Sequence, residues 1–592
     1  ILVPLFFLHR IKKPMLGWLL TTFVAFFFLT FVFLIFQYPK PDVQTLFIGR
    51  VQYIQAHAIF ALWIGYGMIF TLTLLELLLK GNRLVALIGI PLVLSTVMIP
   101  INRNQNDEEF IREVGGCEQN GHDFGWQFGH WQLEGVRALE KELSEEEWAS
   151  FPTPDYPPPM TTNAIFYGGT DPGRFVPTYM IYSAHVREDV YLITQNALAD
   201  NTYMNVMRDL YGDRIWIPSQ QDSNLAFQEY VQDVQSGKIQ AGADVNIENG
   251  RVSVQGVQGV MTINGILARK IFDANKHIHD FYVEESYVIP WMYPFLEPHG
   301  LIMKLNREEL PRLSEEVVDK DRKFWDWYVD RLVGNEKFHR DVVARKTFSK
   351  LRSAIAGLYA ARRMFPESEY AFQQAIDLYP LSPEANFRLA DIYIQQLRFK
   401  EARYVIETFL VEDPGNDRVG EFLEQIKQLE TRDTRRRELE ESLREGGDVN
   451  LALELAEIYR SMNMGPMFEN LTQRILQQAN MPPEVILRIA QMYAGSGRAD
   501  LFANALQQYL QRDPNNARVW VDLAAAQFSM QRTGDGLQSL RRAVSIGGRA
   551  IQDQVRQDPR FEPIRNAPEF QAIIPTVQAQ PQIPSNFRLP GF

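Results

Sequence analysis

The sequence predicts three parts in chain order: a multi-span α-helical membrane domain, an α/β domain, and an all-α solenoid of paired helices. Three observations support this. The first hundred residues are nearly all apolar, strand-like and helical runs mix in the middle, and motifs near the end recur at a fixed spacing. The chain of 592 residues is also too long for one hydrophobic core. The expected boundaries are 1–101, 102–345 and 346–577, followed by an extended tail at 578–592.

Composition narrows the possible functions. The net charge is −12, which argues against nonspecific binding to nucleic acid. Cys117 is the only cysteine, so the sequence allows no internal disulfide and no cysteine-based zinc site. His277 and His279 would share one face of a strand, but no third metal ligand is evident beside them. We therefore expect no metal.

Three apolar stretches predict membrane spans at 16–37, 56–79 and 84–101. The first contains no charged residue, and about 20 such residues cross the ~30 Å hydrocarbon core of a bilayer. The chain begins with Ile rather than Met, and residues 1–8 read as the end of another apolar helix. We therefore expect the true N-terminus to lie upstream of this sequence.

Basic residues in the short loops predict the orientation of these spans. His9 to Lys13 precede the first span, and Lys80 and Arg83 lie between the second and the third. Lysine and arginine favour the cytoplasmic side of a membrane. The loop at 38–55 and the whole chain after Ile101 are then extracytoplasmic.

The middle part mixes strand-like and helical patterns, which indicates an α/β fold. Strand-like runs lie at 163–167, 189–194 and 251–260, and helical ones at 131–143 and 224–235.

A proline-rich stretch interrupts this pattern. Residues 151–159 (FPTPDYPPP) contain consecutive prolines, which exclude a helix. We expect an extended linker there, with a folded unit beginning near Thr161.

The sharpest candidate site is the segment YGGTDPGRF at 167–175. Glycines after a strand let the backbone turn, and the carboxyl ends of strands often carry binding sites in α/β proteins. Asp171 is the candidate catalytic residue. Arg174 is a candidate substrate ligand, because its planar group pairs with phosphate. The alternative is a structural turn in which Asp171 caps the next helix and pairs with Arg174.

Two further clusters supply candidate substrate-binding residues. Asn196, Asp200 and Tyr203 follow the next strand and would face the same crevice. Trp126, in an aromatic-rich segment, would stack on a sugar, although an interfacial aromatic belt explains such residues better. The adjacent carboxylates of Glu284 and Glu285 would point to opposite faces of a strand, so they do not form an acid/base pair.

The last part has an internal repeat. Ala456, Ala490 and Ala524 are 34 residues apart, and Tyr459 and Tyr493 each follow an alanine by three residues. A small residue at one helix contact and an aromatic one turn later allow stacked helices to interlock. A 34-residue period is the tetratricopeptide signature.

Such a solenoid usually binds peptides or partner proteins on its concave face. The alternative is a rigid spacer without a ligand. Residues 418–447 are rich in Arg and Glu and fill one period without the motif, so we expect a divergent helical repeat there.

Taken together, these features resemble a known family. The spans, FYGGTDPGRF, REDVYLITQNALADNTY, EESYVIPWMYPFLEPHGL and the repeat tail are similar to the C-terminal portion of a bacterial membrane family. That family is related to a eukaryotic protein O-mannosyltransferase and is described as a domain of unknown function. The resemblance implies the C-terminal part of a GT-C-like helical bundle in the bacterial cytoplasmic (inner) membrane.

The resemblance also implies a chemistry. GT-C glycosyltransferases move a sugar from a polyprenyl-phosphate donor to an acceptor hydroxyl, without a further cofactor, and a carboxylate in an early outer loop acts as general base. The outer loop at 38–55 offers only Asp42 and Arg50, of which Arg50 would contact the lipid phosphate. No early acidic loop is found, so the catalytic base has no assignment beyond the candidate Asp171.

Two functional hypotheses follow. The first is a membrane glycosyltransferase of GT-C type, or a fragment of one, which acts on a protein hydroxyl at the outer membrane face. The second is a non-catalytic, membrane-anchored tetratricopeptide scaffold that recruits envelope proteins. Both expect membrane lipid and a protein as partners, and the first adds a lipid-linked sugar.

Overall fold

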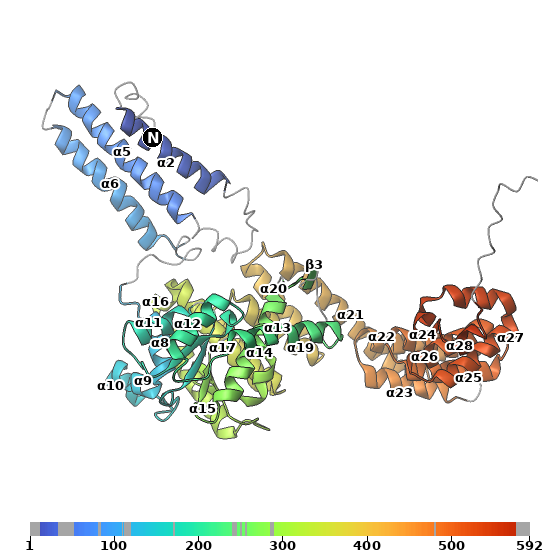
Figure 1. Ribbon diagram of the computed structural model, residues 1–592. Helices are drawn as coiled ribbons and strands as arrows, with labels where there is room; N and C mark the ends of the chain where they lie inside the picture. Colours follow the sequence, from blue (N-terminus) through green and yellow to red (C-terminus); the bar gives the residue numbers. More distant parts are fainter. Residues whose placement is uncertain are drawn as a thin grey trace, which may run out of the picture. The chain divides into compact units, whose positions relative to one another are not determined.

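The computed structural model describes most of the chain, which forms two compact units, residues 1–426 and 427–592. The described residues are 12–32, 53–80, 84–108, 111, 120–169, 172–239, 245–248, 251–254, 257–284, 289–478 and 481–575. Figure 1 shows the elements of each unit.

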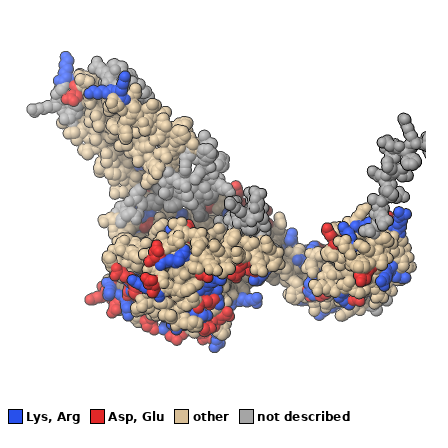
Figure 2. All heavy atoms as spheres, viewed as in Figure 1, with Lys and Arg blue, Asp and Glu red and all other residues tan. Residues whose placement is uncertain are grey.

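Three apolar helices open the chain. α2 (Lys13–Phe27) continues into a π-helical turn, η2 (Phe28–Val32), and is followed by α5 (Ile54–Leu78) and α6 (Leu84–Asn106). In the described part of the chain, these three are long and apolar enough to cross a membrane, by length and composition. Figure 2 shows a nearly uncharged surface along them. Residues 33–37 of the first predicted span lie outside the described residues.

The first two helices run antiparallel. The indole N–H of Trp18 donates to the Tyr66 hydroxyl at 3.2 Å, and that of Trp63 donates to the Thr22 hydroxyl at 3.1 Å. A later residue of α2 therefore meets an earlier residue of α5. This register puts the start of α2 and Lys80, after α5, at one end of the pair. Lys12 and Lys13 thus share an end with Lys80, while the side of the membrane that this end faces stays a prediction.

A five-stranded mixed sheet forms the centre of the soluble part. Its order is β2 (Tyr191–Thr194), β1 (Ile165–Gly168), β5 (Phe281–Val283), β7 (Ile302–Leu305) and β6 (Leu296–His299). β1 pairs in parallel with β2 and β5, whereas β7 pairs antiparallel with β5 and β6. All residues of β1, β2 and β5 are buried, as expected for parallel strands covered on both faces.

Helices surround this sheet. They are α8 (Phe124–Glu134), α9 (Val136–Glu142), α10 (Glu145–Ala149), α11 (Phe175–Tyr182), η3 (Gln195–Ala197), α12 (Asn201–Tyr211), α13 (Gln220–Gln235), α14 (Val257–Asn275), η4 (Pro290–Phe295), α15 (Glu315–Val333) and α16 (Glu336–Arg340). A separate hairpin pairs β3 (Val245–Glu248) with β4 (Arg251–Val254). The strand predicted at 251–260 was therefore too long, because helix α14 begins at Val257.

The proline-rich stretch is not a linker. Phe151 and Tyr156 are buried, and their rings pack on Trp327 and Phe324 at centroid distances of 4.8 and 6.2 Å. The Tyr156 hydroxyl accepts the backbone N–H of Gly300 at 2.8 Å. The prolines exclude a helix, as predicted, but aromatic side chains between them fix the segment to the core.

Paired helices follow from residue 342 onwards. In the first unit they are α17 (Val342–Ala361) with α18 (Phe365–Leu378) and α19 (Pro383–Gln395) with α20 (Phe399–Glu412). In the second unit they are α22 (Val449–Ser461) with α23 (Gly465–Leu476), α24 (Pro483–Gly495) with α25 (Ala499–Arg512), and α26 (Ala517–Ser529) with α27 (Thr533–Gln557). Short elements η5 (Pro559–Ile564) and α28 (Pro568–Gln571) end the described chain.

The motif alanines and tyrosines interlock these helices. Ala456 and Ala490 are fully buried, and the Tyr493 hydroxyl bonds the Thr472 hydroxyl of the preceding helix at 2.6 Å. Tyr459 makes the equivalent bond to Glu440 at 2.7 Å. The predicted role of this motif is confirmed.

One turn residue recurs with the repeat. The residue that turns the chain inside each helix pair has positive φ, at Arg363, Leu397, Asn463, Gly497 and Gln531. The position 34 residues after Leu397 is Thr431, which lies inside the continuous helix α21 (Asp417–Arg444). A β-branched residue strongly disfavours positive φ. The divergent repeat predicted at 418–447 is therefore one long helix rather than a helix pair.

The sheet and the first repeats share one core. A single cluster of buried apolar residues runs from Phe124 to Ile426, across the boundary expected at 345/346. A buried ion pair reinforces it: the Arg352 guanidinium of α17 donates to the Asp321 carboxylate of α15 at 2.9 Å. Tyr359 also donates to Asp321, at 2.7 Å. The second unit has its own, smaller cores.

Candidate functional site

The carboxyl ends of the parallel strands form the first candidate site. The chain leaves β1 toward β2 on one side and later returns to place β5 on the other side of β1. The strand order thus reverses between β1 and β5. Such a switch point is the usual ligand crevice of open α/β sheets.

Glu284, directly after β5, occupies this point. Its side chain is buried, and its carboxylate accepts the backbone N–H of Gly169, after β1, at 3.0 Å. A Cβ on Gly173 would lie 1.6 Å from the Glu284 Oε2 atom, so only glycine fits there. Sequence reasoning missed Glu284 because it was judged only as half of an adjacent pair. The available signal in the sequence was a carboxylate directly after the apolar, strand-like run FYV at 281–283.

The predicted site residues have different outcomes. Asp171, the candidate catalytic residue, lies outside the described residues, and so does Arg50. Arg174 precedes α11, is exposed, and holds its guanidinium 5.3 Å from the Phe175 ring centre. Asn196 lies in η3 at the end of β2, where its backbone carbonyl accepts from the Asn264 side chain at 3.0 Å.

Asp200 and Tyr203 have structural roles. The Asp200 carboxylate caps α12 by accepting the N–H of Thr202 at 2.7 Å and of Tyr203 at 3.2 Å. The Tyr203 hydroxyl accepts the backbone N–H of Thr194 at 2.6 Å. Burial raises the Tyr203 pKa, so the hydroxyl stays protonated. Both residues hold the crevice wall in place.

The aromatic segment around Trp126 is mostly core rather than a membrane-facing belt. Trp131 is buried, whereas Trp126 is 39% exposed. Both indole N–H groups donate to the Glu142 carboxylate at 2.6 Å, and His130 contacts the same group. Burial raises the pKa of Glu142, but these hydrogen bonds outweigh it and lower the pKa overall. The belt interpretation was therefore wrong for Trp131, and for the exposed Trp126 it stays a prediction.

The described residues contain no group of three or more metal-ligating side chains. His279 is buried instead, and its ring Nδ1 pairs with the backbone carbonyl of Asn163 at 2.7 Å.

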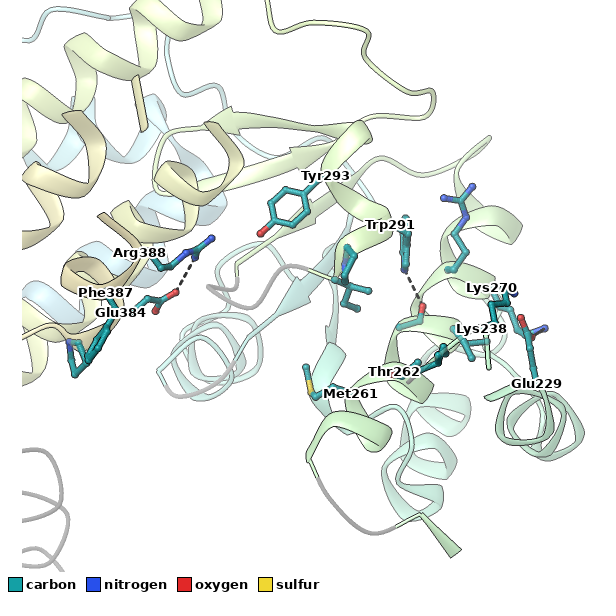
Figure 3. Close-up of a pocket in the computed structure, with 17 residues that line it drawn as sticks. Glu229, Lys238, Met261, Thr262, Lys270, Trp291, Tyr293, Glu384, Phe387 and Arg388 are labelled. Carbon is teal, nitrogen blue, oxygen red and sulfur yellow. Dashed lines mark hydrogen bonds and ion pairs between the residues drawn. The ribbon is translucent and has the colours of Figure 1, made fainter. Parts of the chain in front are cut away.

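A cleft of about 1430 Å³ forms the second candidate site. Helix α19 of the second repeat supplies one wall, and α13, α14 and η4 supply the other (Figure 3). Trp291, Tyr293, Phe387 and Met261 give it a mainly apolar lining. Sequence reasoning did not find this cleft, because residues more than a hundred positions apart build it.

The charges in the cleft are largely balanced. Arg388 pairs with Glu384 at 3.2 Å, and Lys270 lies 3.9 Å from Glu229. Arg269 pairs with Asp273 at 2.8 Å and stacks over the Trp291 ring at 4.8 Å. An apolar ligand with polar flanks fits this lining better than a strongly charged one.

Comparison with known proteins identifies the repeat region. A family model described as tetratricopeptide repeat matches residues 354–417. These residues form tetratricopeptide repeats. The match includes α19, and therefore one wall of the cleft. No curated protein matches the chain.

Several solved structures are similar in fold to parts of the chain. They include YrrB, a TPR protein with an unusual peptide-binding site (14% identity, 38% of this chain, 94% of that chain, TM-score 0.16). Others are the C-terminal part of a TPR repeat-containing protein from Cytophaga hutchinsonii (15%, 37%, 91%, 0.20) and the P58(IPK) TPR domain (13%, 62%, 95%, 0.17). These TM-scores are low, so the repeat assignment rests on the family match and on the helix pairs.

Proposed function

We propose that this chain is a membrane-anchored scaffold that holds an extended segment of a partner protein in the cleft beside α19. The observation that carries the proposal is the position of this cleft. A tetratricopeptide helix forms one of its walls. The apolar helices at the start of the chain would supply the anchor.

The chemistry of the cleft suggests the kind of segment. Aromatic and apolar side chains such as Trp291, Tyr293 and Phe387 suit apolar side chains of an extended peptide. The balanced pairs Arg388–Glu384 and Lys270–Glu229 at the edges suit polar flanks. A partner with two or three apolar residues between polar ones is expected.

Site-specific photo-crosslinking tests this proposal. Benzoylphenylalanine replaces Tyr293, inside the cleft, or Tyr404, which is 70% exposed on α20. We expect a discrete protein adduct from position 293 and none from position 404. The adduct at 293 should decrease when Trp291→Ala removes part of the cleft wall. Equal adducts at both positions, or none at 293, would contradict the proposal.

We propose binding rather than sugar transfer. Two of the residues expected to bind substrate, Asp200 and Tyr203, are engaged in capping α12 and in bonding β2. The glycosyltransferase activity and its polyprenyl-phosphate donor, which the sequence resemblance implied, therefore stay predictions. So does the placement of the soluble part outside the cytoplasm.

A further inference from the structure

An exposed aromatic stripe runs along α11. Phe175, Tyr179 and Tyr182 are 57%, 54% and 46% exposed, and their spacing of four and three residues places them on one face of the helix. The opposite face is buried on the sheet side through Met180 and Ile181. Outside the three N-terminal helices, α11 is the only described helix with three exposed large apolar side chains.

Helix α12 extends this stripe into a face. Its Val206 and Leu210, one turn apart, are each 47% exposed. The hydroxyls of Tyr182 and Tyr211 hydrogen-bond, which joins the end of α11 to the end of α12. We call Phe175, Tyr179, Tyr182, Val206 and Leu210 the aromatic face.

The α11 part of this face carries little charge, whereas α12 places Arg208 and the exposed Asp209 beside Leu210. Residues 175–182 contain no ionisable group except the tyrosine hydroxyls. Arg174, at the start of α11, is exposed. Tyrosine and phenylalanine with a neighbouring arginine are the side chains that favour the boundary between acyl chains and headgroups. No carboxylate on α11 would have to lose its hydration there.

The chain itself keeps a bilayer within reach. Seventeen residues separate Asn106, the end of α6, from Phe124, the start of α8. Such a tether spans at most about 60 Å. If α6 lies in a membrane, the aromatic face meets that surface at high effective concentration, so even weak insertion is sufficient.

We infer that the aromatic face of α11 and α12 docks on the lipid surface of the membrane that anchors the chain. This inference rests on the proposed anchoring. It adds a second, reversible contact with the bilayer, made by a soluble domain. It also holds Arg174 near the lipid headgroups.

Fluorescence quenching by brominated lipids tests the inference in the full chain. Cys117→Ser removes the only cysteine, and single cysteines then carry an environment-sensitive dye in liposomes. Thr178→Cys places the dye on exposed α11, and Ile278→Cys places it on a 76% exposed side chain of the same unit. Leu94→Cys, on α6, reports the anchor.

We expect brominated lipid to remove most of the dye fluorescence at positions 178 and 94, and little at 278. Replacing Phe175 and Tyr182 by serine should restore the signal at 178. Quenching at 94 without quenching at 178 would overturn the inference and leave the anchoring intact. A buried but unquenched dye at 178 would show that a protein covers the face instead. No quenching at 94 would reject the anchoring and the inference together, and equal quenching at 178 and 278 would reject a contact specific to this face.

Discussion

The repeat helices α17 and α24 open two helix pairs of the same type, yet their surroundings differ. Residues 351–359 of α17 are all buried, because the helix packs on its partner α18 and on the α/β core. Helix α24 buries one face, with residues such as Ile489, Ala490 and Tyr493. A repeat period thus determines how helices pair, but the residues outside the motif decide what else each helix touches.

The largest effect is expected from removing the buried ion pair that joins α17 to α15. Arg352→Met leaves the Asp321 carboxylate buried without its cation, which should destabilise the first unit by about 3–5 kcal/mol. Hydrogen exchange followed by mass spectrometry should show faster exchange in α15, α17 and α18, with α24 and α25 unchanged. Equal acceleration in both units would mean that they unfold together.

Acid should also destabilise the first unit more than the second. All nine histidines of the chain precede residue 427. Burial lowers the pKa of His299 to about 4, below the usual 6.5. Between these values the unfolded chain binds a proton that the folded chain refuses, so stability falls as the pH drops from 6.5 to 4, by up to about 3 kcal/mol.

Urea unfolding at a series of pH values measures this. Tryptophan fluorescence reports mainly the first unit, because Trp520 is the only tryptophan of the second. His299→Gln should flatten the pH dependence of the first unit between pH 6.5 and 4. An unchanged slope in this variant would assign the acid sensitivity to other groups.

A smaller effect is expected inside the second unit. Tyr493→Phe removes the hydroxyl that bonds Thr472, both of them buried, and should cost about 1 kcal/mol. Faster exchange should be limited to α23 and α24. Tyr404→Phe, on an exposed ring of the first unit, is the matched control and should change nothing. If the two variants behaved alike, the motif tyrosine would act only through its ring.

The smallest effect concerns a surface pair. Arg435 lies 2.7 Å from Glu454 and 3.2 Å from Glu438, but these side chains are well exposed. Solvent and salt screen such pairs, so Arg435→Ala should leave the urea midpoint and the exchange of both units unchanged. A clear loss of stability would show that α21 depends on its surface charges.

Short sequence patterns predicted the repeat helices and the first two strands. The alternation of small and aromatic residues at a 34-residue spacing predicted the repeats, and two apolar runs predicted β1 and β2. The position of Thr431, where the repeat period would place a turn, shows the limit of periodicity. There the repeat length is almost kept, but the chain continues as the single helix α21 instead of turning.

Long-range contacts explain the misses. Phe151 and Tyr156 are held by Trp327 and Phe324, far along the chain, so a stretch that looked like a linker is core. Glu284 reaches the crevice only because β1 pairs with β5 across more than a hundred residues. The cleft beside α19 has the same origin. A short stretch of sequence cannot reveal such contacts, because the two residues that meet lie far apart along the chain.

The shared core of the first unit has a consequence for synthesis. A ribosome releases Asp321 before Arg352, and the sheet strands before the helices that cover them. The nascent α/β segment therefore reaches the tunnel exit with exposed apolar surface and an unpaired carboxylate. It can finish folding only after α17 and α18 have emerged, so a ribosome stalled near residue 345 would hold an incomplete core that attracts chaperones.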